Sequence, residues 1–245
     1  MSAQTTFARI EKKYLLTPQQ YHALSGVLAQ HLEPDAYGRY SIGNIYYDTG
    51  DYALVRHSLE KPVYKEKLRL RSYGVPGDED ITFLELKKKY KGIVYKRRVE
   101  LPLAAARAYL AGGKKPACKP EQQQILNEID YFLHFYKPEP KVYLAYDREA
   151  YFDPSQPELR ITFDQNIRWR TYDLELSAGD EGSGLSIAGQ ILMEIKIPGA
   201  MPLWLSRTLS ENGIFPTSIS KYGCCYTEFL SQPQYIFIGG MTHAC

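Results

Sequence analysis

Cysteine and histidine are scarce in this sequence. Four of its 245 residues are cysteines and five are histidines, and they follow neither the spacing of a zinc site nor the density of a disulfide framework. No apolar run is long enough to span a bilayer, and the N-terminus lacks the apolar core of a signal peptide. We therefore expect reduced thiols, a cytoplasmic location and no intrinsic membrane segment, with association with a membrane partner left open.

The familiar catalytic motifs are also missing. The chain has no phosphate-binding loop ending in Gly-Lys-Ser/Thr, no Gly-x-Ser-x-Gly, no His-Glu-x-x-His and no dinucleotide fingerprint. Its net charge of +2 gives no reason to expect nucleic acid as a partner. Any chemistry must therefore depend on carboxylates, guanidinium and ammonium groups, and a metal ion.

What the sequence does have is a regular alternation of charged and apolar residues. Lys67, Arg69 and Arg71 alternate with Leu68 and Leu70. Successive side chains of a β-strand point to opposite faces of the sheet, so this segment reads as a strand with one basic face and one apolar face. Taken alone, it is an ordinary half-buried strand with a solvated basic face.

The same alternation recurs along the chain, with both signs of charge on the polar face. The charged positions of the other alternating segments are Glu11 and Lys13, Glu85 and Lys87, Lys96 and Arg98, Arg160 and Asp164, and Glu194 and Lys196. A sheet with one ordinary solvent-exposed face does not need this many charged residues of both signs. A closed barrel accounts for the pattern better, with apolar residues outside under helices and charged residues around a wet interior.

We therefore predict an α+β protein built on an antiparallel barrel, with residues 1–245 forming a single domain and 233–245 a loose tail. A mostly cationic interior is costly without an anionic guest. A phosphate-rich guest bound by Arg and Lys, with carboxylates binding its metal ion, accounts for both signs of charge.

The expected elements follow from the apolar periodicity and from turn residues. Strands are expected at 7–15, 40–48, 63–73, 80–90, 92–102, 141–153, 158–165, 167–175 and 189–198. Helices are expected at 18–30, from a cap at 49–51 to 59, and at 103–111, 121–136, 202–212 and 220–230. Thr17 is the expected N-cap of the first helix, with Pro18 at its first position.

Seven short segments give the chain a family resemblance. They are Ile10-Glu-Lys-Lys-Tyr14, Leu68-Arg-Leu-Arg-Ser-Tyr-Gly74, Leu84-Glu-Leu-Lys87, Tyr146-Asp-Arg148, Leu159-Arg-Ile-Thr-Phe-Asp164, Met193-Glu-Ile-Lys196 and Ser218-Ile-Ser-Lys-Tyr222. In this order they resemble the polyphosphate polymerase domain of the vacuolar transporter chaperone (VTC) complex and its bacterial relatives. That domain belongs to the CYTH-like triphosphate tunnel metalloenzymes. The resemblance covers about residues 5–230.

The resemblance implies an eight-stranded antiparallel β-barrel, the triphosphate tunnel, with flanking helices. It also implies transfer of the γ-phosphate of ATP or another triphosphate onto inorganic polyphosphate, with Mn²⁺ or Mg²⁺ as cofactor. The phosphate-binding positions that it implies are Lys13, Arg69, Arg71, Lys87, Arg148 and Lys221, with hydrogen bonds from Tyr146 and Ser220. Lys96, Arg98, Arg160 and Lys196 are added as candidates because they share the charged faces. The expected catalytic residues are Arg69, Arg71, Lys87, Arg148 and Glu194.

Several alternatives remain open at this point. Glu194 is the first candidate for the metal ligand; Glu85 and Glu11 are further candidates, but either can equally be a salt-bridge partner. The eukaryotic family has Lys-x-Ser-Lys where this chain has Ser218-Ile-Ser-Lys221, so one cation is missing. Two other functions compete with a polymerase: an inorganic triphosphatase or tripolyphosphatase that uses water as acceptor, and a module that binds polyphosphate or nucleotides without turnover.

Overall fold

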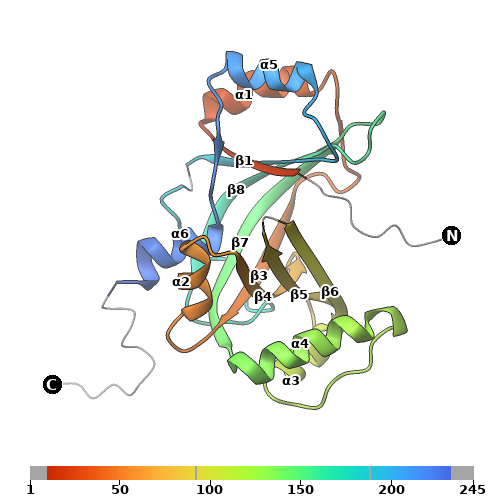
Figure 1. Ribbon diagram of the computed structural model, residues 1–245, viewed down its shortest axis with the longest axis vertical. Helices are drawn as coiled ribbons and strands as arrows, with labels where there is room; N and C mark the ends of the chain where they lie inside the picture. Colours follow the sequence, from red (N-terminus) through yellow and green to blue (C-terminus); the bar gives the residue numbers. More distant parts are fainter. Residues whose placement is uncertain (1–9, 92, 188, 233–245) are drawn as a thin grey trace. The chain divides into compact units, whose positions relative to one another are not determined.

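A computed structural model describes residues 10–91, 93–187 and 189–232 (Figure 1). The chain divides into two compact units, each made of three stretches of sequence. The first unit takes in residues 10–41, 146–167 and 186–219, and the second takes in 42–145, 168–185 and 220–232. The expected tail at 233–245 and the start of the strand expected at 7–15 lie outside the described residues.

The first unit is an antiparallel sheet covered by two helices. Its elements are β1 (Ile10–Leu16), α1 (Pro18–Leu28), β2 (Glu33–Pro34), β10 (Ile191–Ile197), α5 (Leu203–Glu211) and β11 (Pro216–Thr217), with parts of β7 (Glu139–Phe152) and β8 (Arg160–Arg170). The strand order is β11–β1–β10–β8–β7, and β2 pairs with the end of β7. The pairings of β1 with β10 and β11, and of β10 with β8, are antiparallel.

Helix α1 begins where the sequence predicts. The Thr17 hydroxyl accepts from the backbone N–H of Gln20, and the Gln20 side chain accepts from the backbone N–H of Thr17, a capping box that satisfies two otherwise unpaired donors. The helix buries Leu24 and Leu28 in a cluster shared with α5 and with the apolar face of the sheet. Figure 1 shows α1 and α5 lying together over β1 and β8.

The second unit is a larger sheet with helices on its apolar face. Its elements are β3 (Tyr40–Asp48), α2 (Ala53–Leu59), β4 (Tyr64–Tyr73), β5 (Ile81–Tyr90), β6 (Ile93–Pro102), α3 (Leu103–Leu110), the 3₁₀ turn Pro120–Gln122, α4 (Gln123–Tyr136), β9 (Ser183–Gly184), α6 (Lys221–Cys225) and a π-helical turn at Tyr226–Leu230, with the remainder of β7 and β8. The strand order is β7–β3–β4–β5–β6, and β9 pairs with the end of β8.

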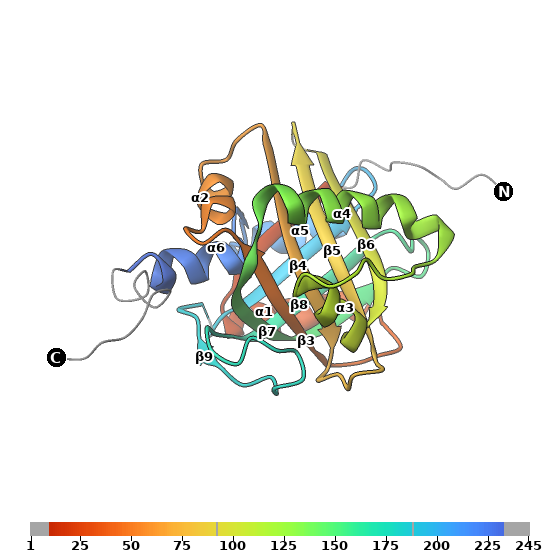
Figure 2. The same cartoon turned by 90° about the horizontal axis from the view of Figure 1, so that it is seen from below.

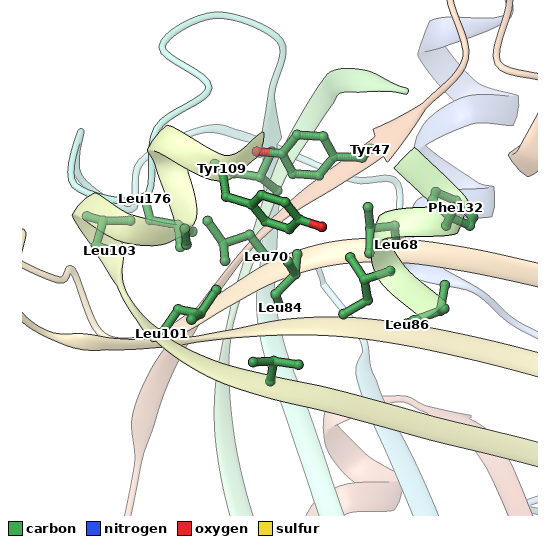
Figure 3. Close-up of a cluster of buried hydrophobic side chains, with 14 of the residues drawn as sticks. Tyr47, Leu68, Leu70, Leu84, Leu86, Leu101, Leu103, Tyr109, Phe132 and Leu176 are labelled. Atoms are coloured by element: carbon green, nitrogen blue, oxygen red, sulfur yellow. The ribbon is translucent and has the colours of Figure 1, made fainter. Parts of the chain in front are cut away.

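The core of the second unit lies between these strands and helices α3 and α4. Figure 2 shows α4 lying across β4, β5 and β6. Leu68 and Leu84 are fully buried on neighbouring strands and belong to one cluster with Phe132 of α4 and Tyr109 of α3 (Figure 3). Burying a leucine or phenylalanine side chain contributes about 1.5–3 kcal/mol. The apolar half of the alternating pattern therefore fixes which face each strand turns to its helices, and the charged half is left on the opposite face.

The predicted α+β class, with an antiparallel sheet and flanking helices, is confirmed. Among the described residues, eight strands have seven residues or more. The segments expected at 158–165 and 167–175 form one strand, β8, because Asn166 takes a positive φ of 49° inside it, a backbone conformation that asparagine tolerates. The hydrogen-bonded order of the described strands runs from β11 to β6.

Within the described part of the chain, no helix is both long enough and apolar enough to cross a membrane.

Candidate functional site

The charged face of the second unit is organised around Glu85. The carboxylate accepts from Nε of Arg69 at 2.8 Å and lies 2.6 Å from another nitrogen of the same guanidinium. Nζ of Lys96 lies 2.8 Å from its other oxygen, and Nε of Arg71 lies 3.9 Å away. The register brings Arg69 directly opposite Glu85 on β4, and Arg71 and Lys96 reach the same carboxylate from positions two residues away from its opposite partners on β4 and β6. We call Arg69, Arg71, Glu85 and Lys96 the Glu85 cluster.

The Glu85 cluster holds more positive than negative charge. Glu85 is 1% exposed, and this burial opposes its ionisation. The charges of Arg69, Arg71 and Lys96 outweigh that effect and hold the pKa of the carboxyl well below its usual range. Burial also lowers the pKa of Lys96 to about 8, against the opposing pull of Glu85. One carboxylate thus neutralises only part of the charge of three cations, which is the environment that an anion would enter.

Other cations of this unit lie along the same face. Lys87 is opposite Lys67 on β4 and Lys96 on β6. Nζ of Lys67 donates to the hydroxyl of Ser220 at 3.2 Å. Ser220 is the N-cap of α6 and accepts from the backbone N–H of Gly223, so Lys221 is the first helical residue beside it. The predicted residues Ser220 and Lys221 therefore belong to the same unit as Lys87 and the Glu85 cluster.

A buried carboxylate that sequence reasoning missed holds α6 in place. Asp48, at the end of β3, is fully buried and accepts from the backbone N–H groups of Leu54 and Val55 at the start of α2. It also accepts from the hydroxyl of Tyr222 at 2.9 Å. The Tyr222 ring stacks on Tyr46 with centroids 4.7 Å apart, and the hydroxyl of Tyr46 accepts from Arg69 at 3.0 Å. Asp48 thus links α6 to the Glu85 cluster through two tyrosines.

Replacing Tyr222 by phenylalanine is expected to lower the free energy of unfolding by about 1–3 kcal/mol, because buried Asp48 loses a hydrogen-bond donor that water cannot replace. Urea unfolding followed by circular dichroism measures the change. Tyr172→Phe is the matched control, since Tyr172 is 64% exposed in the same unit. Equal stabilities of the two variants would contradict the role of Asp48.

The charged face of the first unit is organised around Glu194. One carboxylate oxygen lies 2.8 Å from Nζ of Lys196, and the other lies 3.8 Å from Nζ of Lys13. Lys13 is directly opposite Glu194 on β1, and its Nζ also lies 3.8 Å from Glu11 and donates to the backbone carbonyl of Ile219. Glu11, Lys13, Glu194 and Lys196 therefore meet on one face of the β1–β10 pair.

Arg148 also belongs to this face. It makes a bidentate pair with fully buried Asp164, at 2.6 and 2.8 Å, and its guanidinium lies 5.2 Å from the ring centre of Tyr146. Burial works against its charge, but Tyr146 and Asp164 outweigh it and raise the pKa of Arg148 well above its ordinary value. Paired donors and acceptors of this kind hold a guanidinium in one orientation.

The donor set around Glu194 fits a hard divalent cation. Thr162 is directly opposite Glu194 on β8, and its hydroxyl is buried without a hydrogen-bond partner among the described residues. Carboxylate and hydroxyl oxygens are the ligands that Mg²⁺ and Mn²⁺ prefer. Three or more acidic, histidine or cysteine residues do not come together as a metal site anywhere in the described chain. Waters or substrate oxygens would therefore have to complete the coordination, as is usual for Mg²⁺.

The predicted site residues thus fall into two groups. Arg69, Arg71, Glu85, Lys87, Lys96, Arg98, Ser220 and Lys221 are in the second unit, and Glu11, Lys13, Tyr146, Arg148, Arg160, Glu194 and Lys196 are in the first. Arg160 is opposite Lys196 and lines an open pocket of about 310 Å³ with it. Arg98 lies over the ring of Phe83, at 4.8 Å. The ion pairs of Glu85 favour its interpretation as a partner of cations over that of a metal ligand.

The model of the VTC domain family matches residues 8–230. A putative adenylate cyclase from Bacillus halodurans is similar in structure, with 14% identity, a TM-score of 0.54, and coverage of 91% of this chain and 98% of that one. A putative adenylyl cyclase from Hippeastrum, described as having a dominant triphosphatase activity, shares 17% identity with a TM-score of 0.52, covering 90% of this chain and 96% of that one. No curated protein matches the chain.

Proposed function

Because this chain belongs to the VTC domain family, we propose that it is a metal-dependent phosphotransferase that moves the terminal phosphoryl group of ATP, or another triphosphate, onto inorganic polyphosphate. The observation that carries the proposal is the Glu85 cluster, in which three cations share one buried carboxylate. The proposal includes a cytoplasmic protein without a nucleic-acid partner.

Phosphoryl transfer requires little covalent catalysis by the protein. The protein has to align the reacting groups and neutralise the charge on the phosphate oxygens. Arg69 and Arg71 are two residues apart on one strand, which spaces their Cα atoms by about 7 Å. Glu85 and Asn44 accept from the Nε atoms of these two arginines, at 2.8 and 2.9 Å. The guanidinium groups are thereby oriented before an anion arrives, so less conformational entropy is lost on binding.

For the metal, we propose Glu194 as the protein ligand, with Thr162 beside it and Glu11 as the second carboxylate of the same face. A bound Mn²⁺ or Mg²⁺ would offset the charge that develops on the transferring phosphoryl and leaving groups. Lys13 and Lys196 hold the Glu194 carboxylate from two sides. Arg148, fixed by Asp164, supplies an oriented cation on this face.

The test is incubation of the purified chain with ATP and Mn²⁺, with products resolved by gel electrophoresis and by assay of free phosphate. Long polyphosphate chains are the expected product. Free phosphate without polyphosphate chains would show that the protein is a triphosphatase that uses water as acceptor. Tight binding of tripolyphosphate without any product would show that it is a binding module.

Affinity for inorganic tripolyphosphate is expected to fall as the pH rises through about 8, because the ammonium group of Lys96, whose pKa is lowered to about 8, then loses its charge. A bound anion favours the charged form, so the loss approaches about tenfold per pH unit above that point. Calorimetric titrations between pH 7 and 9.5 measure it. Lys96→Arg, which stays charged, should remove this part of the pH dependence. If the wild type and Lys96→Arg show the same dependence of affinity on pH, another group is responsible for it.

Ser218→Lys is expected to tighten tripolyphosphate binding about 5- to 30-fold, equivalent to about 1–2 kcal/mol for one added phosphate contact. Ser218 is exposed and directly follows β11, which pairs with Lys13 and Tyr14 of β1. Titration at fixed ionic strength measures the effect. Ser210→Lys on α5, also exposed, adds the same charge away from β11 and should change little. Equal gains would show only a general effect of charge.

A further inference from the structure

The β5–β6 hairpin of the second unit carries an apolar surface that no helix within residues 10–232 covers, as far as these are described. Strands β4, β5 and β6 extend past α4, as Figure 2 shows. Leu68 and Leu86 are fully buried beneath the helices, whereas Tyr64, Tyr90 and Ile93, further along the same face, are 40%, 46% and 47% exposed. These last three are directly opposite one another across the three strands. The row between these residues and the buried leucines on this face is Glu66, Lys88 and Tyr95. Apolar residues therefore return at the end of the three strands, beyond the row that ends the buried core.

We call this region the hairpin tip. Its exposed apolar residues are Val63, Tyr64, Tyr90, Ile93, Val94 and Tyr95. Strand alternation puts Ile93 and Tyr95 on the face of Tyr64 and Tyr90, and Val94 on the opposite face beside Lys89. Scattered apolar residues are normal on a protein surface, but the end of a projecting hairpin that is apolar on both faces marks an interaction site.

Lysines surround the same apolar residues. Between Leu86 and Val99 the chain has seven cations and no acidic residue. Of these, Lys88 and Arg97 pair with Glu128 and Lys96 pairs with Glu85, all nearer the core than the tip. Lys65 and Lys89 are directly opposite each other, and Nζ of Lys91 lies 5.4 Å from the centre of the Tyr90 ring. Burial, together with the charges of Lys89 and Lys61, lowers the pKa of Lys65. Positive charges crowded this closely repel one another, and an anionic surface would relieve that repulsion.

This combination selects among partners. A second copy of the same tip would bring lysines against lysines across a symmetric interface, which is unfavourable. A nucleic-acid strand could stack its bases on the tyrosine rings of the tip, but it would leave the aliphatic residues Val63, Ile93 and Val94 without an apolar partner. Tyrosines with a polar end, aliphatic residues and flanking lysines are the side chains that settle at the boundary between lipid headgroups and acyl chains. We propose that the hairpin tip docks on an anionic lipid surface.

Vesicle co-sedimentation of the full chain tests this proposal. Vesicles of 70% phosphatidylcholine and 30% phosphatidylglycerol should bind the protein, and vesicles of phosphatidylcholine alone should bind it far more weakly. Each lysine near such a surface is worth roughly fivefold in affinity. The pair Lys89→Glu and Lys91→Glu should therefore weaken binding at least about 25-fold. The pair Tyr90→Ser and Ile93→Ser should weaken it while leaving the salt dependence in place.

Matched controls separate the tip from general properties of the chain. Lys114→Glu changes an exposed lysine of the same unit, and Phe215→Ser removes a residue of the first unit that is 72% exposed. Neither should alter vesicle binding by more than about twofold. Three outcomes overturn the proposal: equal binding of the tip and control variants, binding indifferent to phosphatidylglycerol, or self-association in solution that the tip variants abolish while vesicles bind nothing.

Discussion

Glu194→Gln is expected to lower metal-dependent turnover about 100-fold or more while leaving metal-free anion binding intact. The substitution keeps the shape of the side chain but removes a hard, charged oxygen ligand. A metal at a phosphoryl group contributes several kcal/mol to stabilising the transition state, and every 1.36 kcal/mol is a factor of ten in rate. Binding of tripolyphosphate without metal should persist or tighten slightly, because the variant no longer has a negative charge next to Lys13 and Lys196.

Two measurements on each variant distinguish a metal ligand from a structural carboxylate: turnover as a function of Mn²⁺ concentration, and Mn²⁺ binding followed by electron paramagnetic resonance. Glu158→Gln is the matched control, since exposed Glu158 lines the same open pocket as Arg160 and Lys196. If Glu194→Gln keeps its metal-dependent rate, Glu194 serves only as the partner of the two lysines. Glu11 would then be the next residue to replace.

Removal of the two arginines of the Glu85 cluster is expected to have a different effect. With Arg69→Ala and Arg71→Ala together, nucleotide affinity and turnover should fall alike, and added metal should rescue neither. Loss of substrate binding and loss of a metal ligand therefore have distinct signatures on the two charged faces.

The second large effect concerns stability. Glu85→Gln is expected to lower the free energy of unfolding by about 3–5 kcal/mol at pH 7, because it leaves the cations of the Glu85 cluster without their counter-charge. The folded-state pKa of Glu85 is depressed below the ordinary value of 4.5. Its contribution is therefore fully present above about pH 4.5 and is lost as the pH falls below it. The difference between wild type and variant should shrink over that same range.

Urea unfolding at several pH values, with and without tripolyphosphate, measures this effect. The anion should stabilise Glu85→Gln more than the wild type, since it replaces the missing negative charge. Glu128→Gln is the control: Glu128 pairs with Lys88 and Arg97 but is 25% exposed, so its loss should cost at most about 1 kcal/mol. Equal costs for the two glutamates would show that Glu85 is not central to the cluster.

Much of the fold was predictable because alternation and caps are local signals. The strand expected at 40–48 is β3 residue for residue, and Thr17 and Pro18 begin α1. The strands expected at 63–73 and 80–90 differ from β4 and β5 by one residue at one end. Apolar periodicity alone is enough to decide which face of such strands meets the helices.

The partnerships within the site were not predictable in the same way. Alternation places Glu85 among cations but cannot say which of them it contacts, because that depends on the register of three strands. Asp48 and Tyr222 are 174 residues apart in sequence, and nothing local connects them. Thr162 belongs to the segment Leu159–Asp164 that carries part of the family resemblance. Only the pairing of β8 with β10, which places Thr162 opposite Glu194, makes its buried hydroxyl a candidate metal ligand.

The pairing of β1 with β10 sets the order in which the newly made chain can complete itself. Ile10 pairs with Ile197, so β1 waits roughly 10–40 s for its partner at synthesis rates of about 5–20 residues per second. During that time Tyr14 and Leu16 cannot be buried as they are in the finished protein. Such long-range pairing also folds slowly. Since each unit draws on three stretches of sequence, we propose that the chain folds as one domain once the last stretch of each unit has been synthesised, and that β1 is a target for chaperones until then.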